Sequence, residues 1–243
     1  PNADFNGTDS FVVRVSDSEF DDNVTIEVTV QNVNDAPVIT EGAGPLEYTM
    51  SEDGTPTAWL LPTLNATDVD SADVLSWIVF TPASHGTAAP LSLSGYASAF
   101  TYSPDPDFNG TDSFVVKVSD GNGGEDVITV NVIVQNVNDP PEITQGAGPL
   151  EVDMTEDDNA TWSPPTLTST DVDFAPTSTW EVSTPASKGT ALFSDSSDSS
   201  TLSYVPNADF NGADSFVVKV SDDNGGEDVI PVTVTVIAVN DAP

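Results

Sequence analysis

The chain lacks cysteine altogether and has little positive charge: its 243 residues include one histidine and four basic residues against 40 acidic ones. Without cysteine, neither a disulfide nor Cys–His catalysis is possible. The net charge of −36 repels nucleic-acid phosphates and anionic membrane surfaces, which argues against both partners. No apolar run reaches the length of a membrane span, so we expect no direct insertion into a membrane.

Helical periodicity is also missing, whereas strand patterns are dense. No long segment has a 3.6-residue apolar period, and 19 prolines and 16 glycines interrupt the chain. Within Ser113–Ser119, the apolar residues Phe114, Val116 and Val118 occupy alternate positions, as in a half-buried strand. A Gly-Asn-Gly-Gly turn that tolerates positive φ follows, and Val127–Gln135 is rich in β-branched residues. These segments predict a β-hairpin.

This hairpin belongs to a repeat with a period of about 102 residues. The sequence Asp-Phe-Asn-Gly begins at Asp4, Asp107 and Asp209, and each copy closes with Asn-Asp followed by Ala-Pro or Pro-Pro. We therefore expect the C-terminal part of one repeat over residues 1–37 and complete repeats over residues 38–141 and 142–243.

The first complete repeat contains about seven strand candidates. They are Val38–Thr40 continuing to Leu46–Met50, Ala58–Leu64, Leu75–Phe80, Ala89–Leu93, Phe100–Tyr102, Ser113–Ser119 and Val127–Gln135. Seven short strands in about 100 residues are typical of a Greek-key sandwich. The predicted fold is all-β, with tandem β-sandwiches of cadherin or Ig type arranged end to end.

Four groups of polar residues recur near the predicted strand ends. They are Glu52-Asp53 with Glu156-Asp157, Asp68-Val-Asp70 with Asp171-Val-Asp173, the Asp-Phe-Asn-Gly segments, and the aspartates Asp17, Asp120 and Asp222 together with the closing Asn-Val-Asn-Asp. Oxygen ligands of this kind suit Ca²⁺ better than Mg²⁺, which retains its waters. Two simpler readings stay open: the acidic residues confer solubility, and Asp-Phe-Asn-Gly forms a turn without metal.

The ordered motifs Glu, Asp-x-Asp, Asp-x-Asn, Ser-Asp-Gly and Asn-Val-Asn-Asp-x-Pro resemble cadherin repeats, in the bacterial cadherin-like form found in large secreted adhesins. The resemblance covers the whole chain and implies calcium between consecutive domains. One joint would use Asp4, Asn6, Asn32, Asn34 and Asp35 with Asp68, Asp70 and Asp120. The next joint would use Glu52, Asp107, Asn109, Asn136, Asn138 and Asp139 with Asp171, Asp173 and Asp222, and Asn138 would contribute its backbone carbonyl.

The sequence departs from the cadherin pattern at several of these ligands. Asn109 stands where the family often has glutamate, and Asn136 where it often has aspartate. Ala238 replaces the first linker asparagine at the far end. Because neutral groups replace charged ones, we expect weaker binding or fewer ions than in animal cadherin joints, near the millimolar range of extracellular modules.

Catalysis has little support in this composition. The single histidine, His85, is replaced by Lys188 in the last repeat, as expected of a solvated loop position. A Ser–His–Asp triad would depend on this one residue, and the carboxylates that could cleave glycosides recur as structural residues do. We therefore expect no enzymatic activity.

The remaining conspicuous side chains have structural interpretations. The sequence pattern predicts that Trp77 and Trp180 lie in core strands, and Trp59 and Trp162 are interpreted as core residues too. The alternative is that these tryptophans stack on sugars. Three basic residues, Arg14, Lys117 and Lys219, share one equivalent outward position, which predicts cross-strand ion pairs; an inter-chain contact is the alternative.

These features predict a calcium-rigidified spacer in an extracellular bacterial adhesin or surface fibre, with neighbouring repeats of the same chain as its first partners. Two alternatives stay open. One is a recognition module for polysaccharide or cell surfaces. The other is a filament subunit in which like chains complete the first, partial sandwich by strand addition.

Overall fold

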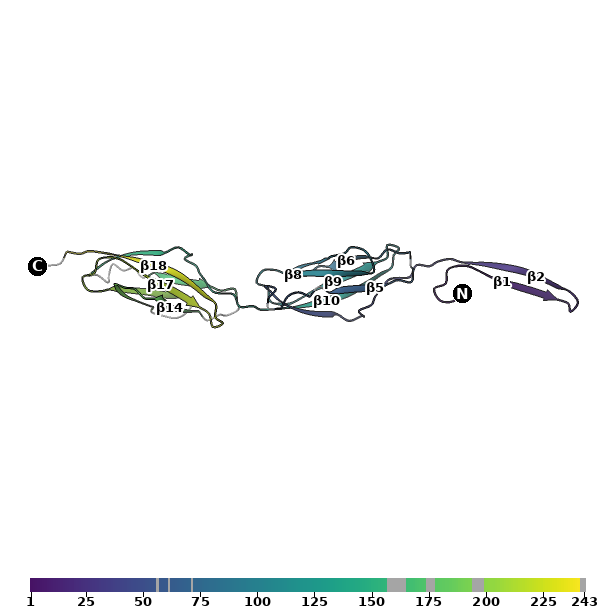
Figure 1. The fold of residues 1–243 in the computed structure, drawn as a ribbon, viewed down its shortest axis with the longest axis horizontal. Coiled ribbons are helices and arrows are strands. Elements are labelled where there is room, and N and C mark those ends of the chain that lie inside the picture. Colours follow the sequence, from purple (N-terminus) through teal and green to yellow (C-terminus); the bar gives the residue numbers. More distant parts are fainter. Residues whose placement is uncertain are drawn as a thin grey trace. The chain divides into compact units, whose positions relative to one another are not determined.

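A computed structural model describes residues 1–55, 57–60, 62–70, 72–156, 165–173, 178–193 and 199–240. The chain divides into two compact units, Pro1–Asn136 and Val137–Pro243, each of which is described by itself. Every helix or strand assigned among the described residues is a β-strand (Figure 1). The all-β class predicted from the alternating patterns is confirmed.

The first unit contains a hairpin followed by a sandwich of two four-stranded sheets. The hairpin pairs β1 (Gly7–Ser16) with β2 (Asp21–Val30). The sandwich strands are β3 (Val38–Ile39), β4 (Leu46–Ser51), β5 (Thr63–Thr67), β6 (Ser76–Thr81), β7 (Gly86–Pro90), β8 (Ala97–Pro104), β9 (Gly110–Ser119) and β10 (Glu125–Gln135). One sheet has the order β4-β10-β9-β6 and the other β3-β5-β8-β7.

The second unit repeats this sandwich strand for strand. Its strands are β11 (Glu142–Ile143), β12 (Leu150–Thr155), β13 (Thr166–Thr170), β14 (Thr179–Thr184), β15 (Gly189–Phe193), β16 (Ser199–Pro206), β17 (Gly212–Ser221) and β18 (Glu227–Ile237). Its sheets have the orders β12-β18-β17-β14 and β11-β13-β16-β15. In both units the long hairpin (β9–β10 or β17–β18) is antiparallel, and the strand that adds beside it (β4 or β12) is parallel.

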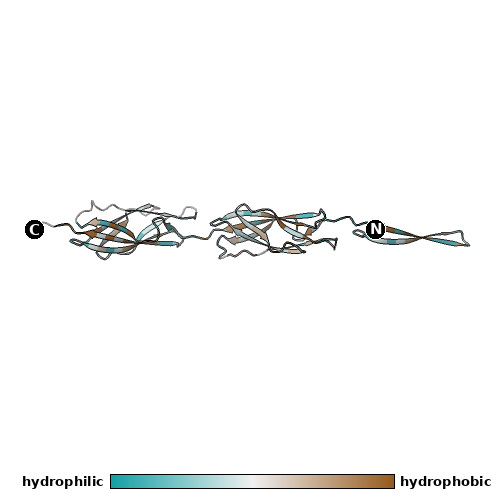
Figure 2. Cartoon of the chain, turned by 90° about the horizontal axis from the view of Figure 1, so that it is seen from above, coloured by the Kyte–Doolittle hydropathy of each residue, from teal (hydrophilic) through white to brown (hydrophobic). Residues whose placement is uncertain are grey.

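The alternating residues of the long hairpin form the core, as predicted. Phe114, Val116 and Val118 are fully buried. In the second sandwich Val218 and Val220 are fully buried, and Phe216 is only 2% exposed. Figure 2 shows apolar residues within the strands of each sandwich. In β1 of the first hairpin, the equivalent residues Phe11, Val13 and Val15 are 55%, 46% and 68% exposed.

Three predictions about the tryptophans are confirmed. Trp77 is fully buried and Trp180 is 4% exposed. Trp59 is half-buried, packs against the rings of Tyr48 and Tyr102 at 5.5 Å, and donates from Nε1 to the carbonyl oxygen of Phe100 at 3.0 Å. These indoles belong to the two cores. Trp162 lies outside the described residues.

Three strand predictions are wrong in detail. The first predicted strand is two strands: β3 pairs with β5 in one sheet and β4 pairs with β10 in the other, with Gly42 at a φ of 97° between them. The prediction Ala58–Leu64 began too early, because β5 starts at Thr63. The prediction Ala89–Leu93 came too late, because β7 is made of small residues that carry little alternation, whereas Leu91 and Leu93 are exposed.

A buried aspartate ties the two sheets of each sandwich together. In the first, Asp112 on β9 accepts the hydroxyl of Tyr102 on β8 and the backbone N–H groups of Ser84 and His85. Gly86 lies beside the tyrosine, and a Cβ there would come within 2.5 Å of the carbonyl oxygen of Ser103. The aspartate thus fixes the loop between β6 and β7 against both sheets.

The predicted cross-strand ion pairs are present. Lys117 contacts Glu125 at 2.8 Å, and Arg14 pairs with Asp21. Lys219 lies between Glu181 at 2.8 Å and Glu227 at 2.7 Å, and these two partners raise the pKa of the lysine to about 12. All of these pairs are intramolecular and exposed on the carboxylate side, so they contribute little to stability.

Candidate metal centre

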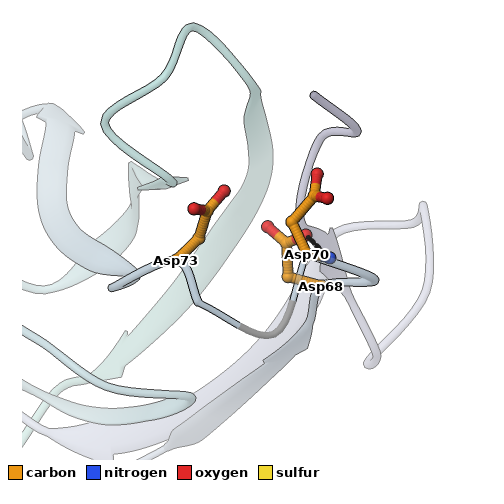
Figure 3. A group of neighbouring side chains, drawn as sticks. All are labelled: Asp68, Asp70 and Asp73. Atoms are coloured by element: carbon orange, nitrogen blue, oxygen red, sulfur yellow. Dashed lines mark hydrogen bonds between the residues drawn. The ribbon is translucent and has the colours of Figure 1, made fainter. Parts of the chain in front are cut away.

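The Asp-x-Asp motif of the first sandwich lies in the loop after β5. Asp68 accepts the backbone N–H of Asp70 at 2.9 Å, a local turn typical of aspartate. This turn brings the carboxylates of Asp68, Asp70 and Asp73 together, with one oxygen of each within 4.8 Å of the others (Figure 3). Three carboxylates gathered this closely repel one another unless a cation neutralises them.

Two oxygens of this cluster have no hydrogen-bond partner among the described residues. Oδ2 of Asp68 and Oδ2 of Asp73 are buried, and neither accepts a hydrogen bond from any described residue. A buried carboxylate oxygen without a donor is destabilising. An all-oxygen donor set with unsatisfied buried oxygens fits a hard divalent cation such as Ca²⁺.

The linker residues that precede β3 contact this cluster. Asn32 donates from Nδ2 to Oδ1 of Asp70 at 2.8 Å, and the backbone N–H of Asp35 donates to Oδ2 of Asp70 at 2.8 Å. Asn6, from the first hairpin, donates to Oδ1 of Asn32 at 2.8 Å. The N–H of Asp35 and the amide of Asn32 hold the pKa of Asp70 below its ordinary value. The structure therefore brings the predicted residues Asn6, Asn32, Asp35, Asp68 and Asp70 into one group.

Asp120 lies next to this group and is 4% exposed. Asn34 donates from Nδ2 to its Oδ2 at 2.7 Å. The backbone N–H groups of Asn122 and Gly124 donate to its Oδ1 at 2.7 and 3.0 Å. The amide of Asn34 is the largest of the influences that lower the pKa of Asp120, and together with the backbone N–H groups it outweighs the opposing effect of burial.

The second unit repeats the arrangement. Asp171 accepts the N–H of Asp173 at 2.9 Å, and Asp173 accepts the N–H of Asp139 at 2.8 Å. Asn138 donates to Oδ2 of Asp222 at 2.8 Å. Oδ2 of Asp171 is buried and accepts no hydrogen bond from a described residue. The predicted residues Asn138, Asp139, Asp171, Asp173 and Asp222 thus form a second group.

The other predicted ligands of the first unit lie at the opposite end of its strands. Ser51 pairs with Gln135, and Gly110 pairs with Val134. Glu52 and Asn136 directly follow Ser51 and Gln135, and Asn109 directly precedes Gly110. All three residues therefore lie at the same end of the sheet. In the second unit the equivalent Glu156 accepts Asn211 at 3.3 Å and the N–H of Val239 at 2.8 Å. That ligands from consecutive repeats share an ion stays a prediction.

The Asp-Phe-Asn-Gly segments are turns in all three copies. Asp4, Asp107 and Asp209 have φ angles of 58°, 57° and 56°, in the left-handed region that aspartate tolerates. The N–H of Phe108 donates to the carbonyl of Asp105 at 3.2 Å. The motif therefore forms a turn, while both the metal-free reading of this turn and a ligand role for Asp4 and Asp107 stay predictions.

Sequence reasoning missed Asp73, Asn122 and Gly124. Asn122 donates from Nδ2 to Oδ1 of Asp73 at 3.0 Å and so connects the cluster to the loop of Asp120. The position equivalent to Asp73 is Pro176, which lies outside the described residues. A search for recurring carboxylates could not have found a residue that occurs once. The Gly-Gly pair at 123–124 recurs at 225–226, and this recurrence could have indicated that Gly124 matters to the structure.

Comparison with known proteins identifies the class. The chain matches the bacterial Ig domain over residues 34–133 and again over residues 138–235. It therefore belongs to that family, as two tandem copies of a cadherin- or Ig-like sandwich. Tandem domains of this kind are typical of extracellular structural or adhesion modules. No curated protein matches the sequence.

Several solved structures of cadherin repeats have a similar fold. Protocadherin Gamma B2 extracellular cadherin domains 1–5 match with a TM-score of 0.55 and 15% identity, over 97% of this chain and 47% of that one. Mouse Protocadherin-24 EC1-3 matches with a TM-score of 0.53 and 13% identity, over 96% and 81% of the two chains. Protocadherin Gamma C5 EC1-3 gives 0.53 and 16%, over 94% and 77%. The chain spans about half the length of the Protocadherin Gamma B2 segment.

Among the described residues, no helix is long and apolar enough to cross a membrane.

Proposed function

We propose that this chain is a calcium-rigidified spacer segment of an extracellular bacterial adhesin or surface fibre, without catalytic activity. The observation that carries the proposal is the cluster of Asp68, Asp70 and Asp73, whose two buried oxygens lack a hydrogen-bond donor among the described residues. In the second unit, the buried Oδ2 of Asp171, which has no hydrogen-bond partner among the described residues, supports the same role.

The residues that would hold the ion differ between the units. In the first, Asp68, Asp70 and Asp73 supply carboxylates, and Asn32 and Asp35 lie within hydrogen-bond distance of Asp70. In the second unit, Asp171 and Asp173 would supply the carboxylates. A bound Ca²⁺ would supply the positive charge that lets these carboxylates lie together.

The mechanical effect follows from electrostatics. In a chain of net charge −36, acidic residues at the end of one repeat and the start of the next repel each other when no cation is bound. A shared ion turns this repulsion into attraction to a common centre. The joint then loses freedom, because separating the domains would expose the ion's ligands. Glu52, Asn109 and Asn136 are the proposed contributors from the preceding repeat.

The recognition alternative would need exposed aromatic rings. Trp59, Trp77 and Trp180 pack into the sandwich cores instead, so these three rings do not favour a sugar-binding surface. The alternative of a filament assembled from like chains stays a prediction; concentration-dependent assembly in sedimentation experiments would support it.

Isothermal titration of calcium into chelator-treated protein tests the proposal. The wild type is expected to bind in the range of about 10⁻⁴–10⁻³ M. The double variant Asp68→Asn/Asp171→Asn should lose most of the binding heat. Asp153→Asn, on the exposed face of β12, removes the same kind of charge elsewhere and should leave binding unchanged. Equal binding by the double variant and the control would refute the assignment.

A further inference from the structure

Asn34 and Asn138 occupy the same position in their two linkers and make the same contact. Asn34 donates to Oδ2 of Asp120 at 2.7 Å, and Asn138 donates to Oδ2 of Asp222 at 2.8 Å. Each amide also donates to the carbonyl of the next residue, at 3.1 Å in both cases. A contact repeated in this way in two sandwiches is a feature of the fold.

N–H donors occupy most of the acceptor positions of the two carboxylates, Asp120 and Asp222. Besides the amide of Asn34, Asp120 accepts the backbone N–H of Asn122 at 2.7 Å. The N–H of Gly124 lies between the two carboxylate oxygens of Asp120, 3.0 Å from Oδ1 and 3.1 Å from Oδ2. Asp222 accepts Asn224 at 2.7 Å and Gly226 at 2.8 Å. A carboxylate offers about four acceptor positions. These two buried aspartates are therefore satisfied by the protein itself, unlike Asp68 and Asp171.

Two glycines allow the linker to lie this close. A Cβ on Gly124 would come within 2.7 Å of the Cα of Ala36 and would overlap Oδ2 of Asp120. A Cβ on Gly226 would come within 2.7 Å of the Cα of Pro140 and would overlap Oδ2 of Asp222. The linker backbone thus packs directly on the turn of the long hairpin, with no room for a side chain between them.

A second aspartate holds the chain a few residues further on. Oδ2 of Asp126 accepts the N–H of Ile39 at 2.8 Å, and Oδ2 of Asp228 accepts the N–H of Ile143 at 2.8 Å. Ile39 and Ile143 are the buried residues of β3 and β11. Each linker is therefore attached to its own sandwich both at the asparagine and at the first strand.

We propose that Asn34 and Asn138 are positioning residues which fasten each linker to the sandwich that follows it, without any metal. Asp120 and Asp222 then act as acceptors for this amide contact, rather than as the calcium ligands that the cadherin resemblance implied. If the proposed function holds, removing calcium frees only the chain on the N-terminal side of Asn34 and Asn138. Residues 34–39 and 138–143 stay with their sandwiches.

Amide hydrogen exchange on the whole chain in excess EGTA tests this inference. The amides of Gly124 and Gly226, which donate to Asp120 and Asp222, should be protected in EGTA to within about tenfold of their protection in 10 mM calcium. Asn34→Ala should reduce protection at Gly124 at least tenfold, and Asn138→Ala should do so at Gly226, because the linker packs directly on these two glycines. Val116 and Val218, in the two cores, report whether each variant is folded.

A conservative pair of variants separates amide donation from packing. Asn34→Asp and Asn138→Asp keep the side-chain shape but replace the donor with a second carboxylate, so in EGTA they should lose more protection than the alanine variants. Amides of Gly124 and Gly226 that are unprotected in EGTA and protected only with calcium would overturn the inference. So would alanine variants with wild-type protection. Failure of calcium to bind at all would instead refute the proposed function, because the test in EGTA does not depend on it.

Discussion

The hydroxyl of Tyr102 donates a 2.9 Å hydrogen bond to Oδ2 of Asp112 across the two sheets of the first sandwich. Tyr204 and Asp214 make the same bond at the same distance in the second. Both aspartates also accept two backbone N–H groups from the loop before β7 or β15. The pair therefore connects three parts of each sandwich that are distant in sequence, and it can be tested one group at a time.

Removing the acceptor should be the most damaging of these changes. Asp112→Ala leaves the N–H groups of Ser84 and His85 and the hydroxyl of Tyr102 without their partner, so we expect a loss of about 3 kcal/mol in the free energy of unfolding. Tyr102→Phe leaves the other donors in place and should cost about 1 kcal/mol. Urea unfolding measures both. Losses of equal size would show that the loop contacts contribute nothing.

Acid should destabilise both sandwiches through the same aspartates. Burial works to raise the pKa of Asp112 and Asp214, but the backbone N–H donors and the tyrosine hydroxyl outweigh it and hold each pKa below its ordinary value. A lowered pKa in the folded state stabilises the protein above about pH 4 and loses that contribution as the pH falls through the folded value. Unfolding free energy measured between pH 6 and pH 2 should fall less steeply in Asp112→Asn/Asp214→Asn than in the wild type.

The glycine beside each tyrosine should not tolerate a side chain. A Cβ on Gly86 would lie 2.5 Å from the carbonyl oxygen of Ser103 and 2.8 Å from the hydroxyl of Tyr102. Gly86→Ala should therefore cost about 2–3 kcal/mol by overpacking. Gly44 is a matched control, because its Cβ would meet no atom within 4 Å and its φ is not positive. Thermal unfolding of Gly86→Ala and Gly44→Ala should differ clearly; equal melting temperatures would contradict the packing described here.

Asp73 should matter for calcium although it occurs in only one repeat. Its Oδ2 has no hydrogen-bond partner in the part of the chain that the structure describes, and the residue lies in the cluster with Asp68 and Asp70. Asp73→Asn removes one of three negative charges, and we expect roughly tenfold weaker calcium binding by the first unit. Titrations followed by NMR, read at amides near Asp70 and near Asp173, distinguish the two units. A change confined to the second unit would contradict this prediction.

Repetition in the sequence was a good guide to what both sandwiches share. The alternation at Phe114, Val116 and Val118 predicted the core, and the paired positions of Trp77 and Trp180 predicted their burial. The recurrence of Asp68-Val-Asp70 and Asp171-Val-Asp173 predicted two equivalent acidic loops, and the structure places the linker residues beside both.

Other features depend on three-dimensional packing that no local pattern records. Strand β7 consists of glycine, threonine, alanine and proline, so its pairing with β8 is invisible as alternation. Asp112 recurs as Asp214, but only the fold shows that it meets a tyrosine ten residues earlier. The position of Asp73 is taken by Pro176 in the last repeat, and Asp73 joins its cluster through a turn in which its N–H donates to the carbonyl of Asp70 at 2.9 Å. The family resemblance suggested Asp120 as a ligand, whereas its hydrogen bonds to Asn34, Asn122 and Gly124 favour a structural role.

The most direct test of the calcium assignment is thermal unfolding of residues 1–243 combined with small-angle scattering on the same samples. The protein would be measured in excess chelator and then across a calcium titration to millimolar concentrations, with magnesium in parallel. A bound ion should raise the melting temperature and make the particle longer and stiffer with calcium, and hardly at all with magnesium. If neither the melting temperature nor the scattering responds to calcium, the acidic loops are turns and surface residues, and the proposed spacer function is wrong.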